Sequence, residues 1–400
     1  MIIQPRTRGF ICLTCHPVGT ANNVKKQIQY VQSQGAIENG PKKVLVIGAS
    51  TGFGLSSRIA AAYGSGAATI GVFHGKAPSK GKTANAGWYN TAAFENDAAK
   101  DGLYAKSVHG DAFSMEVKEA AAALIKKDLG TVDLIVYSLA APKRLDPISG
   151  TNFSSVLKPI GAPFSNKTVD FHAGTVSNIT IQPVEKQEEI DNTIKVMGGE
   201  DWKLWIEVLE KAGVLGENVK TVAYSYIGPE LTFPIYKNGT IGQAKIDLEK
   251  TVPTLNDLMK DVHGAAYVSV NKALVTQSSS AIPVVPLYIS LLYKIMKEKG
   301  IHEGTIEQAY RLFKERLYTA DGAVPVDEAG RIRIDDWEMR DDVQAEVSKL
   351  WDIATSENLA EISDIEGYRN EFFELFGFND PTIDYDVEVD EIVPIASLEK

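Results

Sequence analysis

The chain has 400 residues, of which 44% are hydrophobic and 23% charged, a composition typical of globular proteins. A formal net charge of −11 without a long basic run argues against nucleic-acid binding. The N-terminus lacks a basic-then-apolar signal pattern, and the longest apolar run, residues 281–293, is too short to span a bilayer. We therefore expect a cytoplasmic protein without stable membrane insertion, built as one large α/β domain or as two to three smaller ones.

The first candidate motif, Cys12-x-x-Cys15-His16, is the pattern for covalent attachment of a c-type haem. We set this interpretation aside because no export signal accompanies it and residues three apart on a strand point to opposite faces. A thioredoxin-like pair would need a cysteine at a helix N-terminus within a βαβ unit. Two cysteines cannot form a four-thiolate zinc site either. We predict two reduced, partly buried thiols and no metal site.

Residues 44–63 predict a buried strand, a glycine turn and a helix. Val44–Ile47 is apolar, Gly48, Gly52 and Gly54 follow, and Leu55–Tyr63 has apolar residues at helical spacing. Glycines let the backbone approach a pyrophosphate, and free amides at a helix N-terminus attract its charge. Glycine triplets also occur in ordinary β–α turns, but the flanking strand and helix favour a dinucleotide site. The spacing resembles that of short-chain dehydrogenases and reductases.

The strand predicted at residues 68–73 ends where an NAD-binding fold usually carries an acidic residue for the adenosine ribose. This chain has His74-Gly75 there, and three lysines follow in one loop, Lys76, Lys80 and Lys82. The missing carboxylate removes repulsion against a 2′-phosphate, and the lysines could attract one. We therefore expect NAD(H) as the cofactor, with NADP(H) possible. The alternative is an ordinary solvated basic loop.

The elements that follow alternate as in a doubly wound parallel sheet. We predict strands at residues 104–109, 132–138, 222–229 and 266–270, and a hairpin from 169–172 and 178–181. We predict a loop at 81–89 and helices at 22–34, 91–100, 115–129, 187–197, 201–212, 240–252, 286–299, 304–317, 340–355 and 364–376. The acidic tail, 379–400, should pack on the surface or be partly mobile.

Short or small residues follow the third and fourth strands, at Asp111-Ala112 and Leu139-Ala140. The C-terminal ends of parallel strands line one crevice, so these residues should lie near the cofactor. A polar residue at Asp111 could meet the adenine, and small residues at 138–142 would let the cofactor lie against the backbone. A solvent-exposed turn is the alternative for Asp111.

Tyr236 and Lys245 are the pair that we expect to carry chemistry. A phenol aimed at a carbonyl oxygen can stabilise an enolate and supply a proton, and a nearby ammonium makes it a better donor. In ordinary short-chain reductases these residues lie four apart on one helix face. Here they are nine apart, so the turn at Asn238-Gly239 must bring Tyr236 back over the next helix. The alternative is a core tyrosine and a surface lysine.

Long strings in the chain resemble the trans-2-enoyl-CoA (enoyl-acyl-carrier-protein) reductases of the bacterial FabV type. They are Pro5–Phe10 with His16-Pro17, Gly48–Gly54, Gly87–Asn90, Lys195–Trp202, Tyr226–Pro229, Tyr236-x8-Lys245, Thr276–Pro283 and Asp335–Arg340. The resemblance covers nearly all of the chain. It implies NAD(P)H-dependent reduction of the trans-2 double bond of an enoyl-CoA or enoyl-carrier-protein thioester, the last step of fatty-acid elongation.

The resemblance also implies residue roles. Tyr236 matches the proton donor, Lys245 a cofactor contact and Tyr226 a substrate contact. The remaining matched cofactor positions are Gly48, Ala49, Ser50, Thr51, Gly52, Phe53, His74, Gly75, Asp111, Ala112, Leu139, Ala140, Leu274, Val275 and Thr276. The family usually has Phe-Glu at His74-Gly75, and that Glu favours NADH. Some members have a second lysine where this chain has Ala244, so no role transfers there.

We therefore predict a Rossmann-type doubly wound α/β fold with an elaborated substrate lid and a C-terminal helical extension. We expect one large domain over 1–400, with a cofactor-binding segment at 1–80, a catalytic and substrate segment at 81–317 and the extension at 318–400. We expect a monomeric enzyme whose partner is an acyl-CoA or acyl-carrier-protein thioester. The alternatives are a short-chain ketone or alcohol oxidoreductase and a non-catalytic nucleotide sensor.

Overall fold

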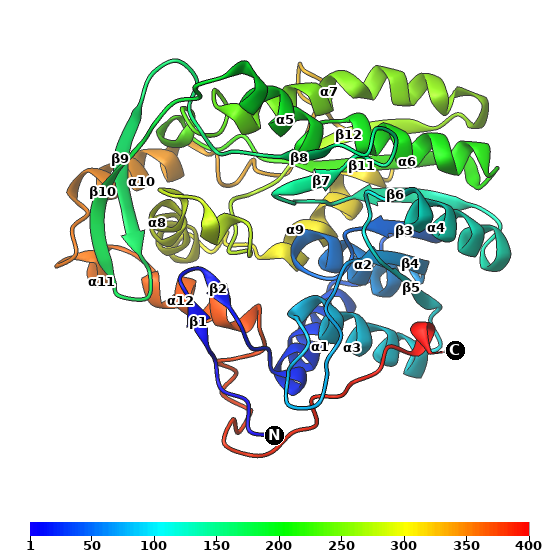
Figure 1. The fold of residues 1–400 in the computed structure, drawn as a ribbon, viewed down its shortest axis with the longest axis horizontal. Helices are drawn as coiled ribbons and strands as arrows, with labels where there is room; N and C mark the ends of the chain where they lie inside the picture. The colour runs from blue at the N-terminus through cyan, green and yellow to red at the C-terminus, as the bar shows by residue number, and fades with distance from the viewer. Residues whose placement is uncertain (400) are drawn as a thin grey trace.

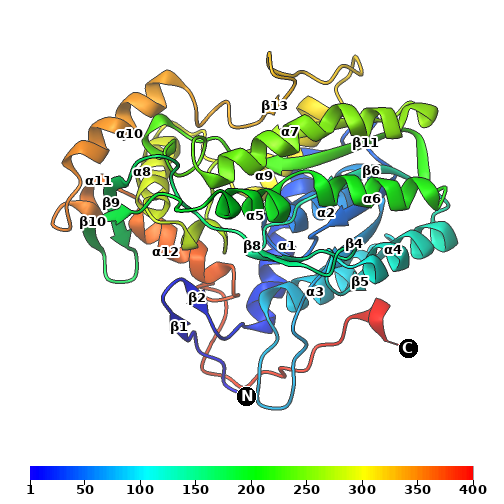
Figure 2. The ribbon, with the colours of Figure 1, turned by 45° about the horizontal axis from the view of Figure 1, so that its top comes forward.

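The computed structural model describes residues 1–399, and its centre is a seven-stranded parallel sheet. The strand order is β13-β12-β11-β6-β3-β4-β5; Figure 1 labels the strands from β12 to β5, and Figure 2 labels β13. The bounds are β3 Lys43–Ile47, β4 Ala68–Phe73, β5 Ala105–His109, β6 Val132–Tyr137, β11 Leu215–Ser225, β12 Ala265–Val270 and β13 Ile332–Arg333. The order reverses between β3 and β6, and ligands of open parallel sheets bind at such a reversal. The predicted doubly wound sheet is confirmed.

Helices cover both faces of the sheet, as Figure 2 shows. One face packs against α1 Pro17–Gln34, α2 Gly52–Ser65, α3 Ala86–Lys100 and α9 Thr305–Leu312. The other packs against α4 Met115–Asp128, α6 Glu200–Lys211 and α7 Thr240–Leu258. Alternate residues of a strand point to opposite faces, so Val44 and Val46 join the first core while Leu45 and Ile47 join the second. β3 is therefore apolar from Val44 to Ile47, after its first residue, Lys43.

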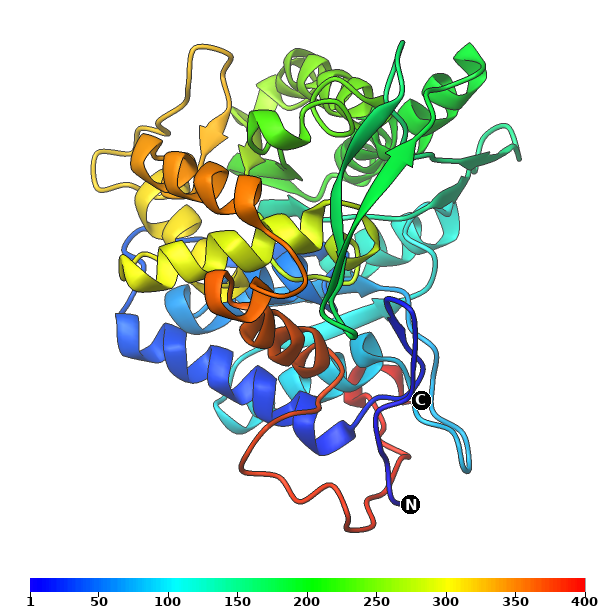
Figure 3. The same ribbon diagram turned by 90° about the vertical axis from the view of Figure 1, so that its left-hand side faces the viewer.

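A third hydrophobic core lies beside the carboxyl ends of the strands. Its helices are α8 Val285–Glu298, α10 Asp341–Ile353, α11 Leu359–Ile362 and α12 Ile365–Glu374, which lie together in Figure 3. The antiparallel hairpin of β9 Phe164–Asp170 and β10 Thr175–Ile181 packs against them. The remaining elements are β1 Thr7–Arg8, β2 Ile11–Cys12, β7 Lys143–Leu145, β8 Asn152–Ser154, α5 Gln187–Met197, and the short turns Glu230–Thr232, Lys260–Val262, Ser279–Ala281, Phe313–Leu317 and Ala396–Leu398. The predicted hairpin and C-terminal helices are present.

Several predicted boundaries were wrong for identifiable reasons. α1 begins at Pro17, because His16 Nδ1 accepts a hydrogen bond from the Gly19 amide at 3.2 Å and caps the helix. α3 begins at Ala86 inside the predicted loop, because the Asn85 side chain caps it in the same way. α7 continues through Pro253 to Leu258, where packing against α5, α6 and β12 outweighs the missing amide.

Both ends of the chain pack onto the folded core. The Met1 amino group donates to the Val389 carbonyl at 2.6 Å, Ile395 is buried, and Ser397 Oγ donates to Glu95 Oε1 at 2.7 Å. Cys12 and Cys15 are free, buried thiols, as predicted. Across residues 1–399, no helix has the length and apolar character needed to cross a membrane.

Candidate active site

A cleft of about 1290 Å³ opens at the carboxyl ends of the central strands. It is lined by Tyr226, Tyr236, Lys245 and the predicted cofactor residues Gly48, Ser50, Thr51, Gly52, Phe53, His74, Asp111, Ala112, Leu139, Ala140, Leu274, Val275 and Thr276. Ala49 and Gly75 lie outside its lining. Ala49 is buried, and its amide donates to the Val72 carbonyl at 3.0 Å. The fold thus brings together, in one cleft, residues that lie more than 200 positions apart in the sequence.

Two of the three glycines in the turn, Gly48 and Gly54, leave no room for a side chain. Gly48 has φ +85°, and a Cβ there would lie 2.1 Å from the Ser138 carbonyl oxygen. A Cβ on Gly54 would lie 1.9 Å from the Gly48 carbonyl oxygen. Gly52, at φ +50°, faces open space and has only a Thr276 methyl within 4 Å. We call the turn Gly48–Gly54 the glycine cradle. It packs closely against the residue that follows β6, Ser138, and it is open toward the cleft at Gly52.

The amino end of α2 is built to receive an anion. Its N-cap, Thr51, makes no side-chain capping hydrogen bond, and the first turn contains no acidic residue. The first amides of a helix have no intrahelical partner, so those that follow Thr51 are available to a ligand. An uncapped helix start beside a glycine cradle fits the pyrophosphate of a dinucleotide, and the residues present therefore suit such a cofactor.

The position after β4 carries no carboxylate. His74 is exposed and lines the cleft, whereas Gly75 is buried and its carbonyl accepts a hydrogen bond from His109 Nε2 at 2.7 Å. The three lysines of the following loop, Lys76, Lys80 and Lys82, are exposed and lie outside the cleft lining. The loop is therefore open to solvent, and its lysines do not supply the cleft with a cation.

A buried ion pair supports the segment after β5. Lys118 Nζ lies 2.8 Å from Asp201 Oδ1 and donates to the carbonyls of Ala112 and Phe113 at 2.8 and 2.9 Å. Tyr137 donates to the other oxygen of Asp201 at 3.0 Å. The desolvation cost of such a pair is offset only when its remaining hydrogen bonds are made, as they are here for Lys118. The pair fixes Ala112 at the edge of the cleft.

Tyr236 follows the short turn Glu230–Thr232, and Lys245 lies on the second turn of α7. The ring of Tyr226 contacts that of Tyr236 edge-on, with centroids 4.9 Å apart. Among residues 1–399 the Tyr236 hydroxyl has no hydrogen-bond partner, and burial raises the pKa of this phenol. It therefore stays protonated and can donate to a ligand in the cleft.

Lys245 Nζ donates to the Tyr224 carbonyl at 3.2 Å rather than to Tyr236. Burial lowers the pKa of Lys245 to about 8, opposed by the charge of Glu249. The Lys245 side chain is partly buried, and among the described residues its ammonium has one carbonyl as hydrogen-bond partner, so it retains donors for a ligand. The structure brings the two side chains to one cleft without a direct hydrogen bond between them.

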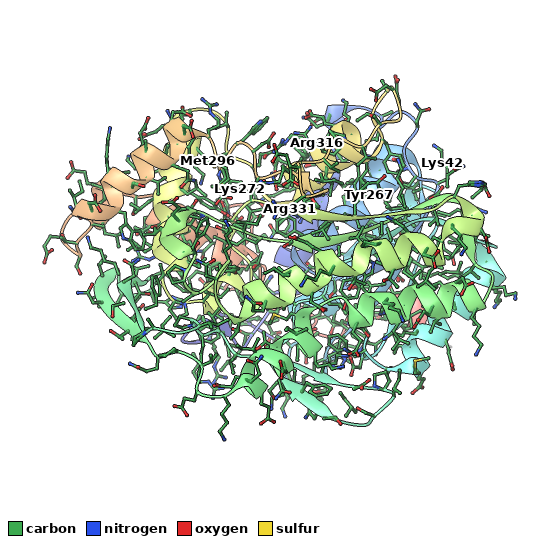
Figure 4. The ribbon with its side chains drawn as sticks, turned by 90° about the horizontal axis from the view of Figure 1, so that it is seen from above. Lys42, Tyr267, Lys272, Met296, Arg316 and Arg331 are labelled. Atoms are coloured by element: carbon green, nitrogen blue, oxygen red, sulfur yellow. The ribbon has the colours of Figure 1, made fainter. Side chains whose placement is uncertain are left out.

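Among the charged side chains in or behind the cleft, Lys272 and Glu338 were not recognised as site residues in the sequence analysis. Lys272 lines the cleft and is buried, and its Nζ donates to the Ala273 carbonyl at 3.0 Å. Figure 4 places Lys272 inside the molecule, between α8, which carries Met296, and the sheet. Glu338, behind the cleft, accepts a hydrogen bond from Tyr226 at 3.1 Å. The string Asp335–Arg340, which carries part of the family resemblance, contains Glu338, but no local spacing links a residue there to Tyr226.

Models of known families match almost the whole chain. Residues 82–318 match the trans-2-enoyl-CoA reductase catalytic region, and residues 2–80 match the NAD(P)H binding domain of trans-2-enoyl-CoA reductase. Residues 326–389, which include α10 to α12, match the enoyl reductase FAD binding domain.

Relatives match at high identity from end to end. The chain is 63% identical to an enoyl-[acyl-carrier-protein] reductase [NADH] of Flavobacterium johnsoniae and 57% identical to a trans-2-enoyl-CoA reductase [NADH] of Ruminiclostridium cellulolyticum, covering 100% of both chains in each case. The trans-2-enoyl-CoA reductase of Treponema denticola, crystallised with NAD, is 49% identical with a TM-score of 0.95, over 99% of this chain and 100% of that one. That of Clostridium acetobutulicum, with NADH, is 42% identical with a TM-score of 0.95 over 100% of both.

This chain shares its fold and its sequence with these proteins over its full length. The shared fold carries the glycine cradle, the uncapped start of α2 and the tyrosines after β11. This chain belongs to the trans-2-enoyl-CoA reductase family.

Proposed function

We propose that this chain reduces the trans-2 double bond of an enoyl thioester, with Tyr236 as proton donor and Lys245 as the cation beside it. Relatives that match it over their full length are named enoyl-acyl-carrier-protein or trans-2-enoyl-CoA reductases. The observation that carries the proposal is the Tyr236 phenol, protonated and without a partner among the described residues, in the same cleft as the glycine cradle.

In this proposal a reduced nicotinamide, when bound, supplies hydride to the β-carbon of the substrate. Negative charge then develops on the thioester oxygen, and the Tyr236 hydroxyl donates a hydrogen bond to it and provides a proton. Lys245, on α7, holds the nicotinamide ribose and stabilises the negative charge on the thioester oxygen. The glycine cradle and the first amides of α2 hold the pyrophosphate. Each group acts from a position fixed by packing, so little reorganisation is needed during the reaction.

The acyl chain is assigned to the apolar part of the cleft. Ile241 and Leu248 of α7 and Val285 and Ile289 of α8 line this part. Tyr226, which contacts the Tyr236 ring, is the substrate contact in this proposal. All these residues come from one chain, so we propose that the monomer is the catalytic unit.

Steady-state kinetics test the proposal. Purified protein with reduced nicotinamide should consume crotonyl-CoA and the crotonyl carrier-protein thioester, and the ratio of kcat/KM values identifies the preferred carrier. Turnover of ketones or alcohols in place of enoyl thioesters would instead show a short-chain-type oxidoreductase. Cofactor binding without loss of reduced-nicotinamide absorbance on any of these substrates would show a nucleotide-sensing protein. Either result would overturn the proposal.

We also propose that NADPH is accepted beside NADH, because no carboxylate faces the ribose at His74-Gly75. Gly75→Glu should lower kcat/KM for NADPH by about tenfold or more while NADH changes little, because juxtaposed like charges cost several kcal/mol. A Cβ at Gly75 would lie 3.0 Å from a Phe73 ring carbon and 3.1 Å from Asn85 Oδ1, so a small local shift must accompany the substitution.

Lys82→Gln is the control for this prediction. Lys82 is exposed and outside the cleft lining, so its removal should leave the NADPH to NADH ratio of kcat/KM unchanged. If the natural chain cannot use NADPH, the proposed dual use of cofactor is wrong. If Lys82→Gln lowers the ratio as much as Gly75→Glu, the basic loop selects the cofactor instead.

A further inference from the structure

Glu338 is a fully buried carboxylate of the C-terminal extension that lies behind the cleft and bonds to Tyr226, which lines it. Its Oε1 accepts hydrogen bonds from the hydroxyls of Tyr226 at 3.1 Å and Tyr288 at 2.7 Å. Its Oε2 accepts one from the backbone amide of Ala273 at 2.7 Å. One side chain thus joins the end of β11, the loop after β12 and α8.

All three partners of Glu338 are donors, which is the arrangement that an ionised carboxylate satisfies, because it accepts only. Lys272 supplies the nearby positive charge, and its pKa is lowered to about 8 by burial against the attraction of Glu338 and other carboxylates. Burial raises the pKa of Glu338, while Lys272 and the Ala273 and Tyr288 donors oppose that rise. A glutamine side chain in the same place has only one acceptor oxygen. Its NH2 group would therefore have to face at least one of these three donors, and that donor would lose its hydrogen bond.

Glu338 reaches both halves of the reaction site through these contacts. Tyr226 meets Tyr236 edge-on at an interplanar angle of 85°. Ala273 immediately precedes Leu274–Thr276, which lines the cleft beside Gly52. Removing the carboxylate would therefore release the tyrosine side and the cofactor side of the cleft together.

Other residues of the extension brace the same loop from behind. Glu371 Oε2 accepts from the Tyr293 hydroxyl at 2.7 Å, and that hydroxyl accepts from the Val275 amide at 3.1 Å. The Tyr368 hydroxyl donates to Ser280 Oγ at 3.0 Å. Among these side chains of the extension, only Glu338 also bonds directly to a tyrosine that lines the cleft, Tyr226.

We propose that Glu338 is a positioning residue for enoyl reduction, which holds the Tyr226 hydroxyl and the Ala273 amide so that Tyr236 and the Leu274–Thr276 segment keep a fixed relation. This inference rests on the proposed function. It makes the C-terminal extension a part of the reaction site, acting through Tyr226 and Ala273 without itself touching the reacting atoms.

Glu338→Gln should lower kcat on crotonyl-CoA by about 10- to 100-fold, the scale of a small misplacement of reacting groups. The dissociation constant of NADH, measured by fluorescence titration without substrate, should rise about tenfold, because the single oxygen of the glutamine amide cannot accept from both the Ala273 amide and the tyrosine hydroxyls. In a double-mutant cycle of Glu338→Gln with Tyr226→Phe, the double variant should have a kcat no lower than that of the worse single variant. Both substitutions break the same hydrogen bond, between the Tyr226 hydroxyl and Glu338.

Glu95→Gln is the matched control. Glu95 is also a buried carboxylate with two hydrogen bonds, to the Ser397 amide and hydroxyl, and it lies outside the cleft lining. The Glu95→Gln variant should lose about as much thermal stability as Glu338→Gln, but its kcat and its affinity for NADH should be unchanged. Equal kcat and equal NADH affinity in the two variants would show that Glu338 is merely structural and overturn the proposal.

Two further arms keep the test decisive. If Glu338→Gln does not fold, Glu338→Asp keeps the charge but withdraws it by one methylene, and its kcat should still fall by about tenfold. Natural activity in a folded Glu338→Asp variant would overturn the proposal. If the natural protein binds NADH but reduces no enoyl thioester, the proposed function fails, and the NADH affinities of the Gln variants still decide whether Glu338 positions the loop.

Discussion

Tyr236→Phe is expected to lower kcat on crotonyl-CoA by about 10²-fold or more, the scale for loss of a general acid together with an oxyanion donor. The phenol is the donor that we assign to the thioester oxygen, and its partly buried position raises its pKa and keeps it protonated. Phenylalanine preserves the edge-on contact with Tyr226, so KM should change much less than kcat. Stopped-flow single turnover would separate the chemical step from product release.

Tyr267→Phe is the control for Tyr236→Phe. Tyr267 lies on β12, its pKa is likewise raised by burial, and it is outside the cleft lining (Figure 4 labels it). Its replacement should leave kcat unchanged. Near-natural kcat in Tyr236→Phe would remove this tyrosine from the mechanism and leave Tyr226 as the next candidate donor.

Lys245→Met is expected to lower kcat/KM by a comparable factor of about 10², through loss of a buried cation beside developing negative charge. The same change should raise the Tm at pH 7. Burial lowers the Lys245 pKa from 10.5 to about 8, and holding the ammonium in the fold costs roughly 3 kcal/mol at that displacement. A catalytic lysine would thus lower stability while it supports activity.

The pH dependence follows from the same group. The Lys245 pKa is depressed in the fold, so its charged form is present below about pH 8 and is lost as the pH rises through that value. kcat/KM of the natural protein, which reports the free enzyme, should therefore fall above about pH 8. Lys245→Met should lack this fall. If kcat/KM of Lys245→Met still falls above about pH 8, another group titrates there, and Lys272 is the first to examine.

Lys220→Met is the control for Lys245→Met. Lys220 is half-buried on β11, its pKa is also lowered by burial, and its ammonium lies over the Tyr318 ring outside the cleft lining. Its replacement should leave kcat/KM and its pH profile unchanged. A loss of activity there equal to that in Lys245→Met would indicate general destabilisation of the sheet in both variants.

Local patterns predicted most of the fold because they depend on neighbours in the chain. β4 Ala68–Phe73 and α5 Gln187–Met197 have the predicted bounds, since apolar runs and helical spacing are local signals. The start of α3 was wrong because Asn85 was not recognised as a cap. The end of α7 was wrong because packing overrode Pro253. The division of the chain near residues 80 and 317 stays a prediction.

The candidate site divides in the same way. The glycine cradle lies in one continuous segment, so its spacing together with the flanking strand and helix indicated a dinucleotide site. Tyr236 and Lys245 were paired by the chemistry of a phenol and an ammonium and by resemblance, and the fold brings both to the cleft, where the lysine donates to the Tyr224 carbonyl. The three loop lysines were given a role by sequence proximity, yet they lie outside the cleft lining.

The amino-acid sequence by itself determined the alternation of strands and helices, the cradle at Gly48–Gly54 and the absence of an acidic residue at Gly75, because each depends on residues within one segment. Only the tertiary structure decided that Glu338 meets Tyr226 across 112 positions and also holds the Ala273 amide. Such contacts depend on how three elements pack around a buried charge, and no periodicity in a single segment encodes that arrangement.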